Sequence, residues 1–150
     1  MSGLLRLPIF AALGACLTLS GCATFPLFGR HLSERECLER AMFFESNRSS
    51  EEGMLAVGTV VMNRVGAPGY PNTICGVVGQ PGQFAPGVLS NRMSGPGLPL
   101  AEKVADRVLA GARHPALDYT THFHEQGYRF PYNNMHYVLE AGGNDFYEKY

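Results

Sequence analysis

Residues 53–65 read GMLAVGTVVMNRV, and this stretch determines what the rest of the chain is expected to form. From Met54 to Met62 the residues are apolar on nearly every side of a helix, as in a helix at the centre of a domain. The preceding Ser49-Ser50-Glu51-Glu52 has the Ser-x-x-Glu spacing of a capping box, and Gly66 follows as a helix end. The sequence therefore predicts a buried central helix that begins after Ser49 and ends at Gly66.

Two further helices are expected, one before the central helix and one after it. Ser33 and Glu36 have the spacing of another capping box, which opens a helix that runs to about Phe44. Pro99 suits the first position of a helix that continues to about His114, where a His-Pro pair ends it. Both segments carry apolar residues at helical spacing, along one face of each helix.

The remaining segments are loops and a small β element. Residues 66–99 are rich in Gly and Pro, and only TICGVVGQ at 73–80 suits a helical turn or two. A loop this long in a compact domain is usually functional or disordered, and its aromatic and amide residues favour a functional wall. YTTHFHE at 119–125 alternates and predicts a short strand, one half of a hairpin, and the aromatic tail carries a turn at 142–144. The fold class predicted is mainly α (α+β), a single domain with a small β element.

The first residues have the pattern of an export signal. In residues 1–21, Arg6 precedes an apolar run and two small residues, which is typical of a secretory signal peptide. LSGC, which ends at Cys22, resembles a bacterial lipobox, in which the signal is cleaved before the cysteine and that cysteine is acylated. An ordinary secretory signal or a poorly spanning anchor is the alternative. We expect a lipoprotein signal peptide at 1–21, a tether at 22–31 and the folded domain at 32–150.

Charge and cysteine content limit the partners. The formal net charge of −1 provides no basic surface for nucleic acid, so no nucleic-acid partner is expected. Of the four cysteines, Cys16 leaves with the signal and Cys22 is the lipidation site, which leaves Cys37 and Cys75. In an exported protein these two can form a disulfide that closes a loop of about 38 residues, or they can remain two buried thiols. The sequence has no CxxC spacing, so these cysteines do not predict a metal site.

Glu45 lies at the joint between the first two predicted helices. It follows Phe43 and Phe44 directly, and a carboxylate in apolar surroundings is costly unless it is used or paired. The negative end of the helix dipole and partial burial both favour the protonated form, so we expect a raised pKa for Glu45. That is the property a general acid needs. The alternative is an ion pair with a nearby arginine, either Arg40, Arg48 or Arg64.

Five blocks follow one another along the chain: RAMFFESNR at 40–48, EGMLAVGTVVMNRV at 52–65, YPNTICGVVGQPGQF at 70–84, THFH at 121–124 and GNDFY at 143–147. Together they resemble the SleB/CwlJ-type cell-wall hydrolases over residues 36–147. The resemblance implies a lysozyme-like domain that acts on the glycan strands of peptidoglycan, typically by lytic transglycosylation. Glu45 matches the family's catalytic Glu, which acts as acid and then as base. This chemistry needs no metal or organic cofactor.

The sequence departs from the family pattern at three points. Ser46-Asn47-Arg48 follows the Glu where relatives often have Ala-Arg-Gly, so the arginine is displaced by one position. The chain contains no Trp, and Asp145 stands where many relatives have a His in their final Gly-x-His motif. These differences concern the C-terminal wall of the cleft and its sugar contacts more than Glu45.

Five residues are candidates for contacts with the substrate. The amide of Gln83 suits an N-acetyl or hydroxyl group, and the ring of Phe84 suits a sugar face, although a core position is as plausible for Phe84. Tyr70 is a similar aromatic candidate. His122 and His124 project from the same face of the predicted strand, since side chains two residues apart point together. We expect them to line the sugar cleft.

The same histidine pair allows a different interpretation. An HxH pair with a third ligand, either His136 or Glu125, would suit zinc. Nothing else in the sequence has ligand spacing, so no metal site is predicted. Asn63 and Arg64, at the end of the central helix, are expected to support Glu45 or, alternatively, to form the helix C-terminus.

The function predicted is glycan-strand cleavage by a lytic transglycosylase or muramidase. We expect an exported monomer, anchored to the envelope membrane through lipidated Cys22 and facing peptidoglycan. Two other functions remain open: a wall-binding lipoprotein that keeps the cleft without turnover, and a zinc-dependent wall amidase that uses His122 and His124.

Overall fold

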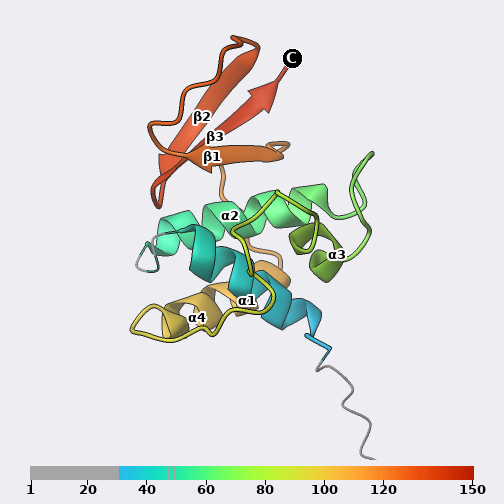
Figure 1. Ribbon diagram of the computed structural model, residues 1–150, viewed down its shortest axis with the longest axis vertical. Helices are drawn as coiled ribbons and strands as arrows, with labels where there is room; N and C mark the ends of the chain where they lie inside the picture. Colours follow the sequence, from blue (N-terminus) through green and yellow to red (C-terminus); the bar gives the residue numbers. More distant parts are fainter. Residues whose placement is uncertain (1–30, 47, 49) are drawn as a thin grey trace, which may run out of the picture.

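The structure is a computed structural model that describes residues 31–46, 48 and 50–150. The predicted signal peptide, Cys22 and nearly all of the tether lie outside the described residues, as does Ser49. In the described part, four helices form one layer and a three-stranded sheet lies against it (Figure 1). The helices are α1 (Glu34–Glu45), α2 (Glu51–Arg64), α3 (Ile74–Val78) and α4 (Leu98–Leu109); the strands are β1 (His122–Glu125), β2 (Met135–Ala141) and β3 (Asn144–Lys149).

Helix α2 is the central helix, as predicted from its apolar run. It contacts α1, α3, α4 and β2, and its residues 53–54 and 56–61 are buried. The predicted cap was wrong by one residue, because Ser50 is the N-cap and its side chain accepts a hydrogen bond from the Gly53 N–H at 3.0 Å. The helix ends at Arg64, and Gly66 follows with a φ of +73°, so the predicted end at Gly66 is correct to within two residues.

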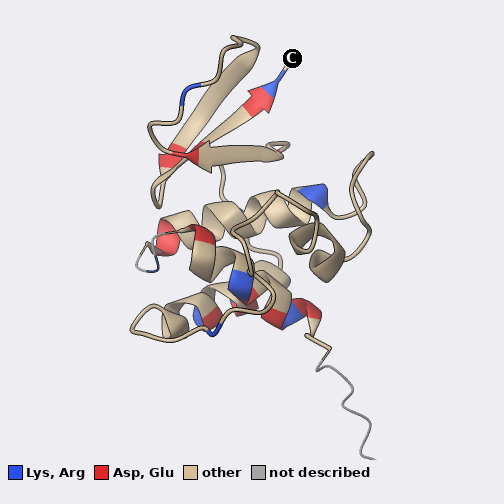
Figure 2. Ribbon diagram, in the orientation of Figure 1, with Lys and Arg blue, Asp and Glu red and all other residues tan. Residues whose placement is uncertain are grey.

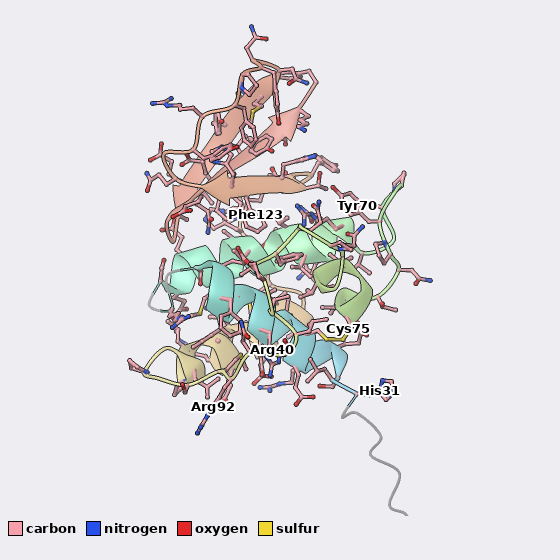
Figure 3. The ribbon with its side chains drawn as sticks, in the orientation of Figure 1. His31, Arg40, Tyr70, Cys75, Arg92 and Phe123 are labelled. Atoms are coloured by element: carbon pink, nitrogen blue, oxygen red, sulfur yellow. A yellow bond between two sulfur atoms is a disulfide. The ribbon has the colours of Figure 1, made fainter. Side chains whose placement is uncertain are left out.

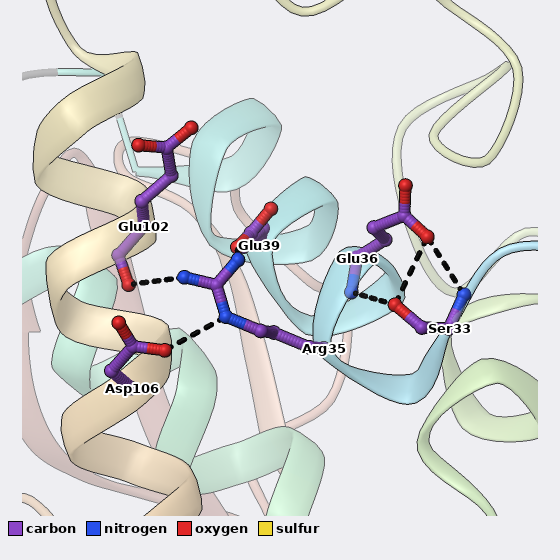
Figure 4. Close-up of polar contacts among 6 residues, drawn as sticks. All are labelled: Ser33, Arg35, Glu36, Glu39, Glu102 and Asp106. Carbon is purple, nitrogen blue, oxygen red and sulfur yellow. Dashed lines mark hydrogen bonds and ion pairs between the residues drawn. The ribbon is translucent and has the colours of Figure 1, made fainter.

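Helix α1 begins with the predicted capping box of Ser33 and Glu36 and packs against α4. Arg35 links the two helices, since it pairs with Asp106 on α4 at 2.7 Å and with Glu39 one turn along α1 (Figure 4). Glu39 is 4 % exposed, and burial raises the pKa of its carboxyl against the opposing charge of Arg35. Basic and acidic residues stand side by side on α1 and α4 (Figure 2).

Helix α4 is shorter than predicted, because it ends at Leu109 rather than near His114. The Ala110 N–H closes the last turn, and Gly111 has a φ of +104°, a conformation that turns the chain away from the helix axis. His114 then donates its backbone N–H to Thr59 Oγ1 on α2 at 2.9 Å. Docking of this segment on α2 therefore replaces the last predicted turn of the helix.

The sheet has the strand order β1-β3-β2, with both pairs antiparallel. The strand predicted at 119–125 begins only at His122, and it pairs with β3 rather than with the next strand along the chain. The hairpin is instead formed by β2 and β3 around the predicted turn at 142–144. Phe123 and the buried Phe146 pair across β1 and β3, with ring centroids 5.5 Å apart.

A disulfide joins Cys37 on α1 to Cys75 on α3, so the open alternative of two free thiols does not apply to the structure. The Glu34 carboxylate strengthens the same junction, because its Oε2 accepts hydrogen bonds from the backbone N–H groups of Ile74 and Cys75. The start of the Gly- and Pro-rich loop is thereby tied to α1. None of the described helices has both the length and the apolar character that crossing a membrane requires.

Candidate active site

Two adjoining cavities form a groove along the side of β1. The first has a volume of about 800 Å³ and the second about 690 Å³, and both are lined by Gly82, Gln83 and Phe123. Each volume lies within the usual range for small-molecule sites. The first chamber is also lined by Phe44, Glu45, Arg48, Phe84, His124, Glu125, Gln126, Gly142, Gly143 and Asn144. The second is also lined by Arg64, Pro68, Gly69, Tyr70, Gln80, His122, Phe130, Tyr132, Tyr147 and Lys149.

Glu45 is the last residue of α1 and is half-buried in the wall of the first chamber. Its Oε1 accepts a hydrogen bond from the backbone N–H of Ala85 at 2.6 Å. Its backbone carbonyl accepts a hydrogen bond from Asn144 Nδ2 at the start of β3. The loop that follows α3 therefore holds the carboxylate, and the sheet holds the backbone of the same residue.

The pKa of Glu45 is raised, in the direction expected from the sequence. Burial is the largest cause; the hydrogen bond from Ala85 and the positive charge of Arg64 act in the opposite direction. The carboxyl therefore keeps its proton to a higher pH than an exposed Glu. At the same time, one donor and one cation remain available to stabilise the carboxylate after the proton has left.

None of the three arginines considered as ion-pair partners forms a salt bridge with Glu45 among the described residues. Arg40 donates through Nη1 to the backbone carbonyls of Val88 and Asn91, on the loop that follows α3. The Arg48 guanidinium lies over the Phe43 ring, 5.1 Å from its centroid. Arg64 affects Glu45 only through its charge.

Asn63 and Arg64 hold the segment that leads into β1. Asn63 Nδ2 donates to the carbonyls of Leu117, at 2.7 Å, and Thr120, at 3.0 Å. Arg64 is 3 % exposed, and its Nε donates to the Thr121 carbonyl at 2.8 Å. Both residues thus position β1 over the end of α2. Around the Arg64 guanidinium stand the rings of Tyr70, Phe84 and Phe123, with centroids at 5.4, 5.5 and 5.7 Å.

The candidate substrate residues of the loop reach the groove. Gln83 is exposed and lines both chambers, so it stands where they meet. Phe84 lines the first chamber and is also partly buried against the core. Tyr70 lines the second chamber. In Figure 3, Tyr70 and Phe123 lie on the side of α2 that faces the sheet.

The two histidines of β1 line different chambers of the groove, His124 the first and His122 the second. Their rings lie 5.5 and 5.3 Å from the ring of Tyr147, respectively, so they share one face of the sheet as predicted. His124 Nε2 is 3.0 Å from the Tyr137 hydroxyl, and His122 Nδ1 is 3.0 Å from Thr121 Oγ1. Within the described ranges, no three His, Cys, Asp or Glu side chains form a group able to hold a metal ion.

Several residues of the first chamber were not among the candidates from sequence. Glu125, considered from sequence only as a third zinc ligand, supplies a second carboxylate to this chamber, and Gly142, Gly143 and Asn144 supply part of its wall. A Cβ added at Gly53 on α2 would lie 2.5 Å from Gly142 Cα, so two glycines let the hairpin turn dock closely on α2. The Gly-Gly turn was visible in the sequence, but its place beside Glu45 depends on the pairing of β1 with β3.

The comparison with protein families decides which family this is. The model of the cell wall hydrolase family matches residues 48–147, two thirds of the chain. The chain belongs to the cell wall hydrolase family. The match begins just after Glu45, so it covers most of both chamber walls but not the carboxylate itself.

Solved structures with the same fold include relatives from two bacilli. One is the catalytic domain of the germination-specific lytic transglycosylase SleB from Bacillus anthracis, with 20 % identity and a TM-score of 0.62 over 81 % of this chain and 98 % of that one. The other is the catalytic domain of the Bacillus cereus SleB protein, with 21 % identity and a TM-score of 0.62 over 79 % and 94 %. No curated protein matches the chain. The lysozyme-like, mainly α fold predicted for this cell wall hydrolase is confirmed.

Proposed function

We propose that this cell wall hydrolase cleaves the glycan strands of peptidoglycan as a lytic transglycosylase, with Glu45 as the single general acid and base. The observation that carries the proposal is the setting of Glu45, a half-buried carboxyl with a raised pKa in the wall of an open groove. A carboxyl in that state keeps its proton to a higher pH than an exposed Glu and can transfer it to a ligand in the first chamber.

The proposed reaction transfers one proton in total, from the sugar's 6-hydroxyl to the leaving oxygen by way of Glu45, and it consumes no water. Glu45 gives its proton to the glycosidic oxygen, the bond from that oxygen to the sugar carbon breaks, and an oxocarbenium-like centre forms. The 6-hydroxyl of the same sugar then attacks this carbon, and its proton passes to the Glu45 carboxylate, which leaves a 1,6-anhydro end. The Ala85 N–H and the charge of Arg64 favour the carboxylate, so they stabilise Glu45 between the two proton transfers.

The substrate contacts proposed here follow the groove. The scissile bond lies in the first chamber beside Glu45, with His124 and Phe84 in the same wall. The strand continues past Gln83, whose amide suits an N-acetyl group, into the second chamber with Tyr70 and His122. Asn63 and Arg64 act as positioning residues, because they hold the approach to β1.

Hydrolysis is the second candidate, and one residue favours it. Glu125 lines the same chamber as Glu45, and a second carboxylate is what a glycoside hydrolase uses to activate water or to attack the sugar. If the protein is a transglycosylase, the Glu125→Gln variant should keep most of the turnover and still release anhydro products. Under hydrolysis, the same change removes turnover, and the native protein produces reducing ends.

The place of action proposed is the cell envelope, with the protein as an exported monomer anchored through lipidated Cys22. The motif at Cys22 and the short segment before residue 32 support this proposal. In cells supplied with labelled fatty acid, the label should be attached to the native protein and not to the Cys22→Ala protein. Equal labelling of both chains would exclude this anchor.

The experiment that tests the proposed function uses purified sacculi and mass spectrometry of the released fragments. The native protein and Glu102→Gln, a matched change of an exposed carboxylate on α4 that lines neither chamber, should release anhydro-ended fragments, and Glu45→Gln should release none above background. Turnover that survives in Glu45→Gln removes Glu45 from its role. Binding without turnover by the native protein favours the wall-binding lipoprotein, and chelator-sensitive release of peptides favours the zinc amidase.

A further inference from the structure

The two chambers differ in charge. In the described part of the chain, the second chamber is lined by Arg64, His122 and Lys149 and by no Asp or Glu. The first chamber contains two carboxylates, Glu45 and Glu125, and one arginine. The second chamber therefore has a positive charge that the first, with its mixture of carboxyl groups and one arginine, does not have, although the net charge of the whole chain is only −1.

Arg64 is a buried cation with unused hydrogen-bonding capacity. It is 3 % exposed, and among the described residues its Nη1 has no hydrogen-bond partner. It forms no ion pair with a described carboxylate. The Thr121 carbonyl, the Tyr70 side chain and the charge of Glu45 stabilise its cation, but a buried donor such as Nη1 without an acceptor is costly. Gln80, which lines the same chamber, also has a buried and unpartnered Oε1. Both atoms are closed off from solvent, so Arg64 acts on a ligand in this chamber through its charge, and the Gln80 oxygen, itself an acceptor, offers no hydrogen bond to a carboxylate.

One more cation extends the positive field from Arg64 to the chamber rim. Lys149, at the end of β3, is exposed, and its Nζ lies 5.4 Å from the centroid of the Tyr132 ring. The pKa of His122 is lowered, first by burial and then by the charges of Lys149 and Arg64, so this imidazole takes up a proton less readily than an exposed one. An anionic ligand group would be attracted by both cations, and a neutral group would gain nothing from them.

We propose that the second chamber binds a carboxylate on the 3-O-lactyl arm of the substrate's muramic acid residue, between Arg64 and Lys149. This inference rests on the proposed function for the identity of the substrate. Of the two sugars that alternate in peptidoglycan, only muramic acid has such an arm. Its carboxylate is either the lactyl group itself, in a strand without peptide, or one of the carboxylates of the stem peptide that extends it.

Binding of the arm would determine which linkage is cleaved. Because only every second sugar carries the arm, a carboxylate in the second chamber allows the strand to bind in one register and in one direction. The same one of the two alternating glycosidic linkages is then presented to Glu45 in the first chamber. The second chamber is thus a specificity pocket, and Arg64 serves it as well as the positioning of β1.

The test measures binding to Glu45→Gln, which stops turnover and separates this inference from the proposed reaction. The ligands are a disaccharide with its stem peptide, the peptide-free disaccharide with a free lactyl carboxylate, and the methyl esters of both. Titration calorimetry in low salt gives the preference for each acid over its ester. Lys149→Gln removes one cation of the chamber, and Arg129→Gln is a matched control, an exposed cation that does not line it.

We expect at least one acid to bind more tightly than its ester, and Lys149→Gln to reduce this preference about two- to fivefold, as for loss of one solvent-exposed ion pair. Arg129→Gln should leave it unchanged. A preference confined to the peptide-bearing ligand assigns the stem carboxylates, and a preference for the peptide-free ligand assigns the lactyl group. Equal affinity for acids and esters, equal loss for all ligands in Lys149→Gln, or no measurable binding overturns the inference.

Loss of the buried cation requires a second variant. Arg64→Lys keeps a positive charge but loses the forked donors, and circular dichroism checks that it folds. It should lower the preference for acids by more than Lys149→Gln does. Cleavage of sacculi by the native protein without any acid preference would overturn the pocket and leave the proposed function intact. A preference for acids without cleavage of sacculi would support the pocket and overturn the proposed function.

Discussion

Removal of the disulfide should cost the protein a large part of its stability. The Cys37–Cys75 bond has a sequence separation of 38 residues. In the chain-entropy description, closure of a loop this long lowers the entropy of the unfolded chain by about 13 cal/mol/K, or about 3.9 kcal/mol at 25 °C. With an unfolding entropy of about 2.1 cal/mol/K per residue over roughly 120 folded residues, Cys37→Ala/Cys75→Ala should lower Tm by about 15 °C.

The activity of this double variant should survive well below its lower Tm. Glu34 still accepts the N–H groups of Ile74 and Cys75, so the junction of α1 and α3 keeps its polar contacts. The loop after α3, which brings Ala85 to Glu45, then keeps its native position at low temperature.

Calorimetry or circular dichroism of the native, reduced and doubly substituted proteins provides the measurement. Reductant should lower the Tm of the native protein to nearly that of the double variant and should not affect the variant itself. A decrease of less than about 5 °C would refute the reasoning, because it would mean that the bond barely restricts the unfolded chain.

Three further predictions concern the surroundings of Glu45. Gly53→Ala should destabilise the protein by about 1–3 kcal/mol and reduce turnover, because the new methyl group would lie 2.5 Å from Gly142 Cα. Denaturant unfolding measures the loss, and an unchanged free energy of unfolding would contradict this contact. Asn144→Ala should lower stability by about 1–2 kcal/mol, since Asn144 is 5 % exposed and donates to the Glu45 carbonyl; a loss below about 0.3 kcal/mol in the same assay would exclude its role. Glu45→Gln should gain stability relative to the native protein as pH rises from below 4.5 to neutrality. A raised pKa means that the folded state binds more protons than the unfolded state in that window, so the native protein loses stability there and the variant does not. Thermal melts at pH 4 and pH 7.5 test this, and an equal difference in Tm at both pH values would contradict it.

The elements predicted well from sequence are those whose signals are local. The Ser33 capping box begins α1, and the apolar run of 53–65 forms the buried α2. The end of α4 could not be predicted in this way, since the Gly111 turn is fixed by docking of the following segment on Thr59. Strand β2 was missed because its burial does not alternate, and its register shifts between Tyr137 and Leu139.

The candidate site also combines features that the local sequence predicts with features that depend on the tertiary fold. The position of Glu45 beside two Phe residues at a helix end is encoded within a few residues, and its raised pKa could be predicted from them. The second carboxylate of the chamber, Glu125, could not, because it reaches the groove through pairing of β1 with a strand some twenty residues later. The donor at Ala85 is a backbone group, which no side-chain pattern reveals.

The most direct test of the central claim is a pH titration of the Glu45 carboxyl carbon by NMR, with Glu45→Gln to assign its signal. The account predicts a midpoint clearly above the ordinary value of 4.5, and a decline of sacculus cleavage as pH rises through the same midpoint. A midpoint at or below 4.5, with cleavage undiminished where the carboxyl is fully ionised, would contradict the claim that Glu45 donates the proton.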